Sequence, residues 1–335
     1  MSRSEYVNVI REIALENDLK FSSFSHDWII RIDRGLESTF IFGYYFDINP
    51  SASSEICKEK PATSEVLKQA NICHIEHAVF LNPGHPLTEG YVSSSGSLTQ
   101  LFEFCSVHRN DVVVKPLKGT GGLDVVRARN RKEIETAVLS IFSKELGVAV
   151  SPYVELGDEY RVICLNGEAR LIYRKKRAEI VGDGSQTVSQ LIIQYMRNLS
   201  DPRGVAKCLA ECQDYNHVLH AGETLPIQWK HNLGLGLSEV QFDIESCLQL
   251  ELKVIAQKAV SSLGMKFCSV DIAQKKLSND LIVVEVNAGV MMDVFMKDPA
   301  RRNIAKEIYK EAILASFKQY TYVCSWKCNK VIYFL

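Results

Sequence analysis

"LIVVEVNAGVMM", residues 281–292, has the apolar composition of a buried strand, yet it contains a carboxylate and an amide two positions apart. Side chains alternate between the two faces of a strand. Glu285 and Asn287 are therefore predicted to share one face with Leu281 and Val283, and the opposite face would carry Ile282, Val284 and Val286. Two oxygen-bearing side chains on one face of such a strand point to a function for that face.

A second apolar segment, "FCSVDIA" (residues 267–273), precedes this strand and carries Asp271. We expect the two segments to pair as a hairpin with its turn near residues 276–280, and one register of that hairpin puts Asp271 opposite Glu285. A slip of one residue would move the two carboxylates to opposite faces, so the prediction depends on the turn.

The three oxygen-bearing side chains need a reason to lie together, because facing carboxylates repel each other unless a cation lies between them. Carboxylate and amide oxygens suit Mg²⁺, which takes one or two carboxylates and fills its shell with phosphate oxygens and water. A solvated outer face of an edge hairpin is the alternative. Three such residues on one predicted face favour a metal site made of Asp271, Glu285 and Asn287.

A metal that binds phosphate oxygens implies a phosphate-binding segment elsewhere in the chain, and "VVVKPLKGTGGLDVVRAR", residues 112–129, is the candidate. Lys115 ends a buried strand there, and a flexible turn follows whose N–H groups could close on phosphate oxygens. The turn contains Gly119, Thr120, Gly121 and Gly122. The chain has no P-loop motif. Lys60 precedes a predicted helix in "KEKPATSEVL" and, taken alone, reads as a surface lysine.

The remaining secondary-structure signals mix hairpins with long helices. Asn166-Gly167 joins two strands and is a strong hairpin signal. Asn130 is the expected N-cap of a helix that runs toward Gly147, and "TVSQ" (187–190) is an expected capping box. Residues 243–264 form a long amphipathic pattern. This mixture predicts an α+β fold rather than a doubly wound parallel sheet.

The bulk composition excludes several classes of protein. The 335 residues include 46% hydrophobic and 24% charged residues, and the net charge is −1, so bulk charge gives no case for nucleic-acid or membrane binding. No apolar stretch approaches the ~20 residues that span a bilayer. The first 18 residues have no apolar signal-peptide core, so we expect a cytoplasmic protein.

The ten cysteines are scattered along the chain. "CLAEC" (Cys208, Cys212) and "CSWKC" (Cys324, Cys328) repeat a four-residue step that a shared metal could use. Ordinary reduced thiols are favoured, because structural zinc pairs are usually closer and better defined.

Together the lysines, the glycine-rich turn and the D…E-x-N set resemble the ATP-grasp superfamily. The sequence from about residue 50 to 300 is similar to the ATP-grasp part of cyanophycin synthetase, and more distantly to glutathione synthetase and D-alanine–D-alanine ligase. "EYRVICLNGEARLIYRKKRAEIVGDGSQTVSQLI" carries its strand–turn–strand and V-G-D-G run, and "HAGETLPIQWKHNLGLG" is similar to its G-E…N-L stretch. Several motifs in one order make the likeness specific.

The resemblance implies two α+β lobes that grip ATP. It implies an N-terminal segment (1–50) packed on an ATP-grasp domain (51–320), with a flap lobe at about 111–152 and a C-terminal lobe at about 153–320, and a tail (321–335). ATP would be held by residues from both lobes: Lys60, Lys115, Gly119, Thr120, Gly121, Gly122, Ser151, Pro152, Tyr153, Val154 and Glu159.

The resemblance also implies two Mg²⁺ ions, for which Mn²⁺ could substitute, bound by Asp271, Glu285 and Asn287. Arg161 and Arg174 are the expected catalytic residues, facing an acyl phosphate or a substrate carboxylate, and a solvated charged strand face is the alternative for each. Lys175, Lys176 and Arg177 read equally well as such a face.

The implied activity is an ATP-dependent ligase that joins a carboxylate to the amine of an amino acid or peptide through an acyl phosphate. Its partners would be small-molecule or peptide substrates, without nucleic acid or membrane, and a homodimer is compatible with the sequence. Two alternatives stay open: an ATP-grasp kinase for a small alcohol, and an ATP-binding module without turnover. The complete D…E-x-N set argues against the module.

Overall fold

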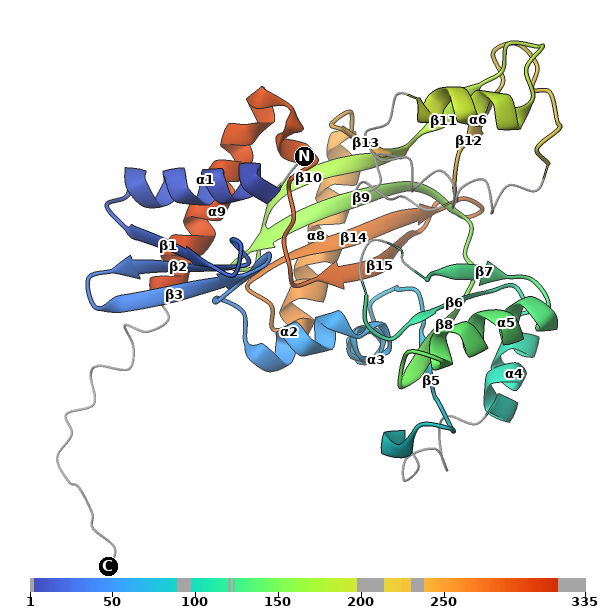
Figure 1. The fold of residues 1–335 in the computed structure, drawn as a ribbon, viewed down its shortest axis with the longest axis horizontal. Helices are drawn as coiled ribbons and strands as arrows, with labels where there is room; N and C mark the ends of the chain where they lie inside the picture. Colours follow the sequence, from blue (N-terminus) through green and yellow to red (C-terminus); the bar gives the residue numbers. More distant parts are fainter. Residues whose placement is uncertain are drawn as a thin grey trace, which may run out of the picture.

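The computed structural model describes residues 3–88, 98–119, 122, 124–197, 214–229 and 238–318. Within these residues the strands form four sheets, and the pairings within them are antiparallel. Helices pack on the larger sheets (Figure 1). The α+β class expected from the sequence is confirmed.

A five-stranded sheet forms the centre of the molecule (Figure 1). Its order is β13 (Ser238–Gln241), β10 (Glu168–Arg177), β9 (Leu156–Leu165), β14 (Phe267–Lys275) and β15 (Leu281–Asn287). Helix α8 (Ser246–Leu263) covers one face with Leu252, Ala256 and Val260. It ends at Gly264, whose φ of +64° is left-handed and favours glycine.

The N-terminal segment adds α1 (Arg3–Glu16) and a four-stranded sheet at one end of the molecule (Figure 1). The strands are β1 (Lys20–Phe24), β2 (Ile29–Arg34), β3 (Glu37–Phe42) and β4 (Tyr45–Phe46). Ile10, Ile30 and Ile41 share one core with Ile163 of β9 and Tyr309 of α9 (Pro299–Lys318). This segment is therefore packed directly on the central sheet.

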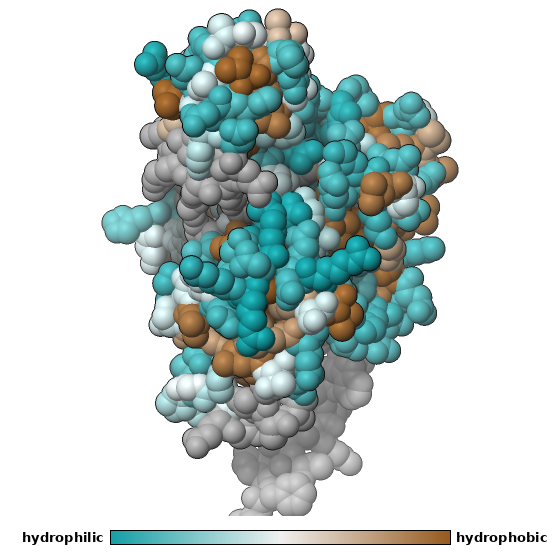
Figure 2. Space-filling view, turned by 90° about the vertical axis from the view of Figure 1, so that its right-hand side faces the viewer, coloured by the Kyte–Doolittle hydropathy of each residue, from teal (hydrophilic) through white to brown (hydrophobic). Residues whose placement is uncertain are grey.

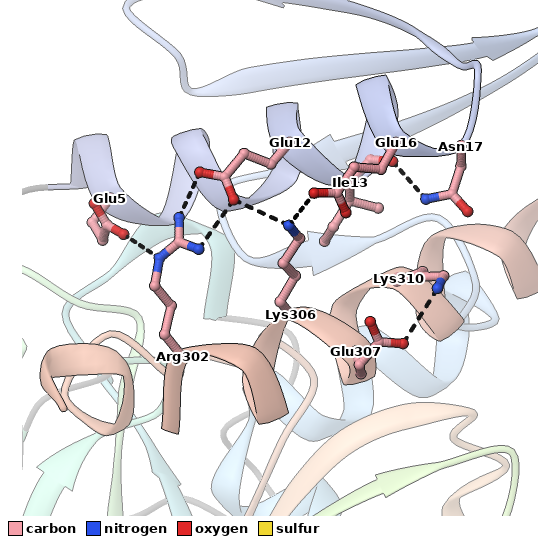
Figure 3. Close-up of polar contacts among 9 residues, drawn as sticks. All are labelled: Glu5, Glu12, Ile13, Glu16, Asn17, Arg302, Lys306, Glu307 and Lys310. Carbon is pink, nitrogen blue, oxygen red and sulfur yellow. Dashed lines mark hydrogen bonds and ion pairs between the residues drawn. The ribbon is translucent and has the colours of Figure 1, made fainter. Parts of the chain in front are cut away.

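Ion pairs also join α1 to α9 (Figure 3). Arg302 donates to Glu5 at 2.7 Å and to Glu12 at 2.6 and 3.0 Å, and Lys306 donates to Glu12 and Glu16. These bonds raise the pKa of Arg302 and lower that of Glu12. Because the pairs are partly exposed, they orient α1 more than they stabilise the fold.

A smaller lobe is built on the sheet β5 (Ala78–Leu81), β8 (Gly147–Pro152), β6 (Val112–Pro116) and β7 (Val126–Ala128). Helices α4 (Leu98–Val107) and α5 (Arg131–Phe142) pack on it. Asn130 caps α5 as expected, but the helix ends at Phe142 and does not reach Gly147. Gly147 instead begins β8, where an added Cβ would lie 2.8 Å from the Phe80 carbonyl oxygen.

Helices α2 (Ser51–Lys58) and α3 (Lys60–Gln69) follow the N-terminal sheet in the chain. Two short 3₁₀ turns, η1 (Pro86–Thr88) and η3 (Phe295–Lys297), lie before α4 and before α9. A projecting element contains β11 (Glu179–Val181), α6 (Val188–Met196) and β12 (Thr224–Pro226) around its own small core. Its capping box of Thr187 and Gln190 is confirmed.

Figure 2 shows the side of the molecule that lies to the right in Figure 1 as mostly hydrophilic, with scattered hydrophobic residues rather than one broad apolar face. No helix among the described residues is long and apolar enough to cross a membrane. The domain boundaries inferred from the sequence stay a proposal, and residues 321–335 and the four cysteines with four-residue spacing lie outside the described ranges.

Candidate active site

A cavity of about 310 Å³ is lined by both lobes. The central sheet contributes residues of β9, β10, β14 and β15, and the small lobe contributes β6, β8 and the turn after β6. Nearly all the described residues expected in the site line it: Lys60, Lys115, Gly119, Gly122, Ser151, Pro152, Tyr153, Val154, Glu159, Arg161, Asp271, Glu285 and Asn287. The exception is Arg174.

The hairpin of β14 and β15 has the register that brings its carboxylates together. Asp271 pairs with Glu285, and Ser269 pairs with Asn287, so the expected facing arrangement is confirmed. A β-bulge then interrupts the ladder, because Ile272 pairs with Val283 and leaves Val284 as the extra residue. The strict alternation expected from the sequence is therefore wrong for the residues before Glu285, because Val283 packs in the core under α8 beside Val286.

Asp271 is buried and held by two cations. Arg161 donates from Nε and Nη2 to the two carboxylate oxygens of Asp271, both at 2.7 Å, and Lys175 Nζ lies 3.1 Å from Oδ2. Burial alone would raise the pKa of Asp271, but Arg161 and then Lys175 outweigh it and hold that pKa well below its usual range. Lys175 also pairs with Glu159, so Arg161, Asp271, Lys175 and Glu159 form a neutral set in which Arg161 alone is partly exposed.

Lys175, for which the sequence left a substrate contact and a solvated face equally open, lines the cavity, whereas its neighbour Arg174 does not. Arg174 instead donates to Asp158 and Gln241 and also pairs with Asp243. The cause is a second bulge. The Asn166-Gly167 turn pairs Ala169 with Cys164, but Leu171 pairs with Ile163, so Arg170 is extra.

The bulge shifts the register of β10 by one residue. An unbroken ladder from the turn would place Arg174 opposite Glu159, whereas the observed ladder places Lys175 there and Tyr173 opposite Arg161. Since the side-chain period is two, Arg174 is turned to the other face of the sheet. The catalytic role expected for Arg174 therefore loses its geometric basis.

Lys60, at the start of α3, and Lys115, on β6, line the cavity together with Glu285. Lys60 Nζ lies 3.7 Å from Glu285 Oε1 and donates to the Gly119 carbonyl oxygen at 3.0 Å. Lys115 Nζ lies 2.8 Å from Nε2 of His77, a partly buried residue that no sequence pattern singles out. Burial, then the charge of Lys60, lowers the pKa of Lys115 to about 7, against an opposing effect of Glu285. Phosphate oxygens beside this amine would add negative charge and favour its ammonium form.

The turn after β6 begins close to α3. Lys118 forms a bridge with Glu59 in the main chain, and the side chains of the same two residues lie 3.2 Å apart. Gly119 has φ of +148° and Gly122 of +68°, and the latter is left-handed. Thr120 and Gly121 lie outside the described residues. The described part of the turn thus contacts Lys60 and lines the cavity.

The connection from β8 to β9 also borders the cavity. Ser151 is buried, and the Tyr153 N–H donates to the Asp111 carbonyl oxygen at 3.0 Å. The guanidinium of Arg127 lies 3.3 Å from the Tyr153 ring centroid and donates to both Asp111 carboxylate oxygens. Trp229 lines the cavity beside Tyr153, with ring centroids 5.9 Å apart. Trp229 is identified as a cavity residue only by its position in the fold.

The donor set suits a divalent cation at Glu285 and Asn287. The Glu285 side chain is 33% exposed, and Asn287 Nδ2 lies 3.4 Å from its Oε2, so a flipped amide would turn a second oxygen to the same place. Asp271 differs, since both its oxygens already accept bonds from cations. The described residues contain no cluster of three or more His, Cys, Asp or Glu arranged for a metal.

Sequence comparison supports the resemblance seen in the motifs. The chain is 24% identical over 213 residues to the glutathione biosynthesis bifunctional protein GshAB of Streptococcus agalactiae serotype V. This alignment covers 56% of the chain and 28% of that protein. The chain is 26% identical over 242 residues to the cyanophycin synthetase of a Synechocystis species, and this alignment covers 64% and 27%. The chain thus matches about a quarter of the length of these curated relatives. No protein-family model matches it.

Structural comparison supports the fold. The chain is similar to the crystal structure of a D-alanine–D-alanine ligase from Bacillus anthracis, with a TM-score of 0.52, 14% identity, and coverage of 82% of this chain and 71% of that one. At this level of identity the likeness concerns the fold alone. The chain has the ATP-grasp fold that its sequence predicts.

Proposed function

We propose that this ATP-grasp chain is an ATP-dependent ligase, which joins a carboxylate to the amine of an amino acid or peptide and forms ADP and phosphate. The observation that carries the proposal is the meeting of Lys60 with Glu285, 3.7 Å apart, in a cavity that Lys115 and Asn287 also line. Lysines for phosphate and oxygen donors for a divalent ion thus share one space. Phosphoryl transfer needs chiefly such positioning and charge neutralisation.

In this proposal ATP lies along the cavity. Adenine contacts the backbone of residues 151–154 beside Trp229, and the ribose lies near Glu159. Lys60 and Lys115 bind the phosphates, and Lys115 regains its full charge when it does so. The flap, including Gly119–Gly122, closes over the phosphates, and this requires Lys60 to exchange the Gly119 carbonyl oxygen for a phosphate oxygen.

Mg²⁺ would be held by Glu285 and Asn287 and would neutralise charge on the phosphates. Asp271 is the third ligand suggested by the sequence, and it would bind an ion only through the lone pair that its bonds to Arg161 and Lys175 leave on Oδ1. A second ion and substitution by Mn²⁺ belong to the same proposal. Arg161 lies beside this site and would face the acyl phosphate.

The chemistry takes two steps. A carboxylate oxygen of the acid attacks the γ-phosphorus, the bond from that phosphorus to the β–γ bridging oxygen breaks, and ADP leaves. The amine nitrogen then attacks the carbonyl carbon of the acyl phosphate, loses a proton, and expels inorganic phosphate. The carboxylate is a poor electrophile until the first step gives it a phosphate leaving group.

Trapping with hydroxylamine tests this function. A screen of amino acids and dipeptides, with ATP, Mg²⁺ and hydroxylamine, should give a hydroxamate together with an equal amount of ADP. ADP accompanied by a stable phosphate ester, without hydroxamate, would instead identify an alcohol kinase. Binding of a non-hydrolysable ATP analogue without ADP formation from any acid or alcohol would identify a binding module.

A further inference from the structure

The strand directions give the cavity two distinct ends. β9 and β15 both run antiparallel to β14, so they run parallel to each other. Starting from the connection at residues 151–154, β9 presents Glu159 and then Arg161. β15 presents Glu285 and then Asn287, and the chain continues past the end of the strand to Met291. The end beyond Arg161 is therefore the far end from the proposed adenine position.

The far end is lined mainly by apolar side chains. Tyr173 and Phe295 are each 1% exposed and stack with ring centroids 5.5 Å apart and an angle of 28° between the rings. Met291 and Val294 complete this wall, and Ser269 supplies a hydroxyl group. Arg161, which lies opposite Tyr173 in the sheet, marks the border of this end, and the described lining residues beyond it carry no charge.

Four charged groups at the border of this end already neutralise one another. Arg161 and Asp271 are joined by two bonds of 2.7 Å, and Lys175 is shared between Asp271 and Glu159. A charged substrate group at the far end would lose water without gaining a free counter-charge, which disfavours its binding. An apolar group would pack against this wall without such a loss of hydration.

We infer that the acid substrate carries an uncharged, apolar side chain, aliphatic or aromatic, which lies against Tyr173, Phe295 and Met291. The inference rests on the proposed ligase function, because that function puts the reacting carboxylate beside Glu285 and leaves the far end for the rest of the acid. The walls thus select against acids with aspartate-, glutamate- or lysine-like side chains.

The test compares leucine, methionine and phenylalanine with aspartate, glutamate and lysine as the acid, and hydroxylamine serves as the common amine. These acids share the same backbone groups, so differences in kcat/KM report the side chain. We expect the best apolar acid to exceed every charged one by at least ~10-fold, the discrimination that a single apolar pocket contact provides.

A charge placed in the wall makes the test specific to this surface. Met291→Arg should raise kcat/KM for glutamate relative to leucine by ~10-fold or more, because it supplies the missing counter-charge. Ile304→Arg is the matched control, since Ile304 is also 45% exposed but lies on α9 outside the cavity lining. The control should leave the ratio unchanged.

Failure of this inference can be told from failure of the ligase function. Hydroxamate formed as well from glutamate or lysine as from leucine would overturn the inference and leave the ligase intact. If no acid gives hydroxamate, saturation-transfer NMR with the ATP analogue and Mg²⁺ decides: binding of leucine but not glutamate supports the apolar wall, and any other pattern refutes it.

Discussion

Lys115 should take up a proton when ATP binds. Burial and the charge of Lys60 hold its pKa at about 7 in the nucleotide-free chain, against an ordinary value of 10.5. Phosphate oxygens beside Nζ would favour the ammonium and raise the pKa again. At pH 8 the titratable site of Lys115 would hold ~0.1 proton in the nucleotide-free protein and ~1 in the nucleotide complex, so binding takes up ~0.9 proton. At pH 7 the uptake would be ~0.5.

The sign of the pH dependence follows from this uptake. Because the bound state holds the additional proton, raising the pH from 7 to 9 should weaken nucleotide binding, approaching tenfold per pH unit above pH 8. Isothermal titration calorimetry with a non-hydrolysable ATP analogue and Mg²⁺, in two buffers of different ionisation enthalpy, gives the number of protons directly.

Lys115→Arg is the matched variant, because a guanidinium stays charged at every pH in this range. Protons that the nucleotide itself binds or releases are common to both proteins, so the difference between them isolates Lys115. Equal proton uptake by the two proteins, or an uptake in the wild type that does not grow between pH 7 and 8, would refute the assignment of Lys115 to the phosphates.

Three further outcomes follow from the site. Glu285→Gln should reduce kcat/KM at least ~100-fold and remove the Mg²⁺ dependence of nucleotide affinity without lowering the Tm; an unchanged Mg²⁺ dependence would count against this ligand. Lys175→Met should lower the free energy of unfolding in urea by ~3–5 kcal/mol, because it removes the cation that pairs with two buried carboxylates. Arg174→Met should lower it by at most ~1 kcal/mol, and equal losses would contradict the register. Amides of Gly119 and Gly122 should exchange more slowly with nucleotide, and identical exchange rates would argue against the flap.

Local sequence pattern was sufficient for the hairpin of β14 and β15. Two apolar runs of matching length joined by a short turn allow few registers, and burial of one face selects among them. The polar residues Asp271 and Glu285 then meet because the pairing is local and starts from the turn. The cavity-lining positions of Lys60, Lys115 and Gly119 likewise follow from motifs that have a recognisable order along the chain.

Sequence pattern failed where the backbone departs from regular geometry. A single extra residue, Arg170 on β10, exchanges the faces of Arg174 and Lys175, and no residue type there signals a bulge. Val284 has the same effect on Val283. His77 has no motif around it. Trp229 lies within the stretch "HAGETLPIQWKHNLGLG", but no residue pattern there marks it as a cavity residue, so tertiary contacts alone identify both side chains.

The most direct test of the ligase follows one oxygen atom. An acid substrate labelled with ¹⁸O in both carboxylate oxygens is incubated with ATP, Mg²⁺ and an amine, and the inorganic phosphate is analysed by mass spectrometry. Activation through an acyl phosphate predicts that each phosphate released carries one ¹⁸O from the acid, in step with the amide formed. Amide formation with unlabelled phosphate would contradict the mechanism, and ADP formed with no transfer of label to phosphate would contradict the ligase itself.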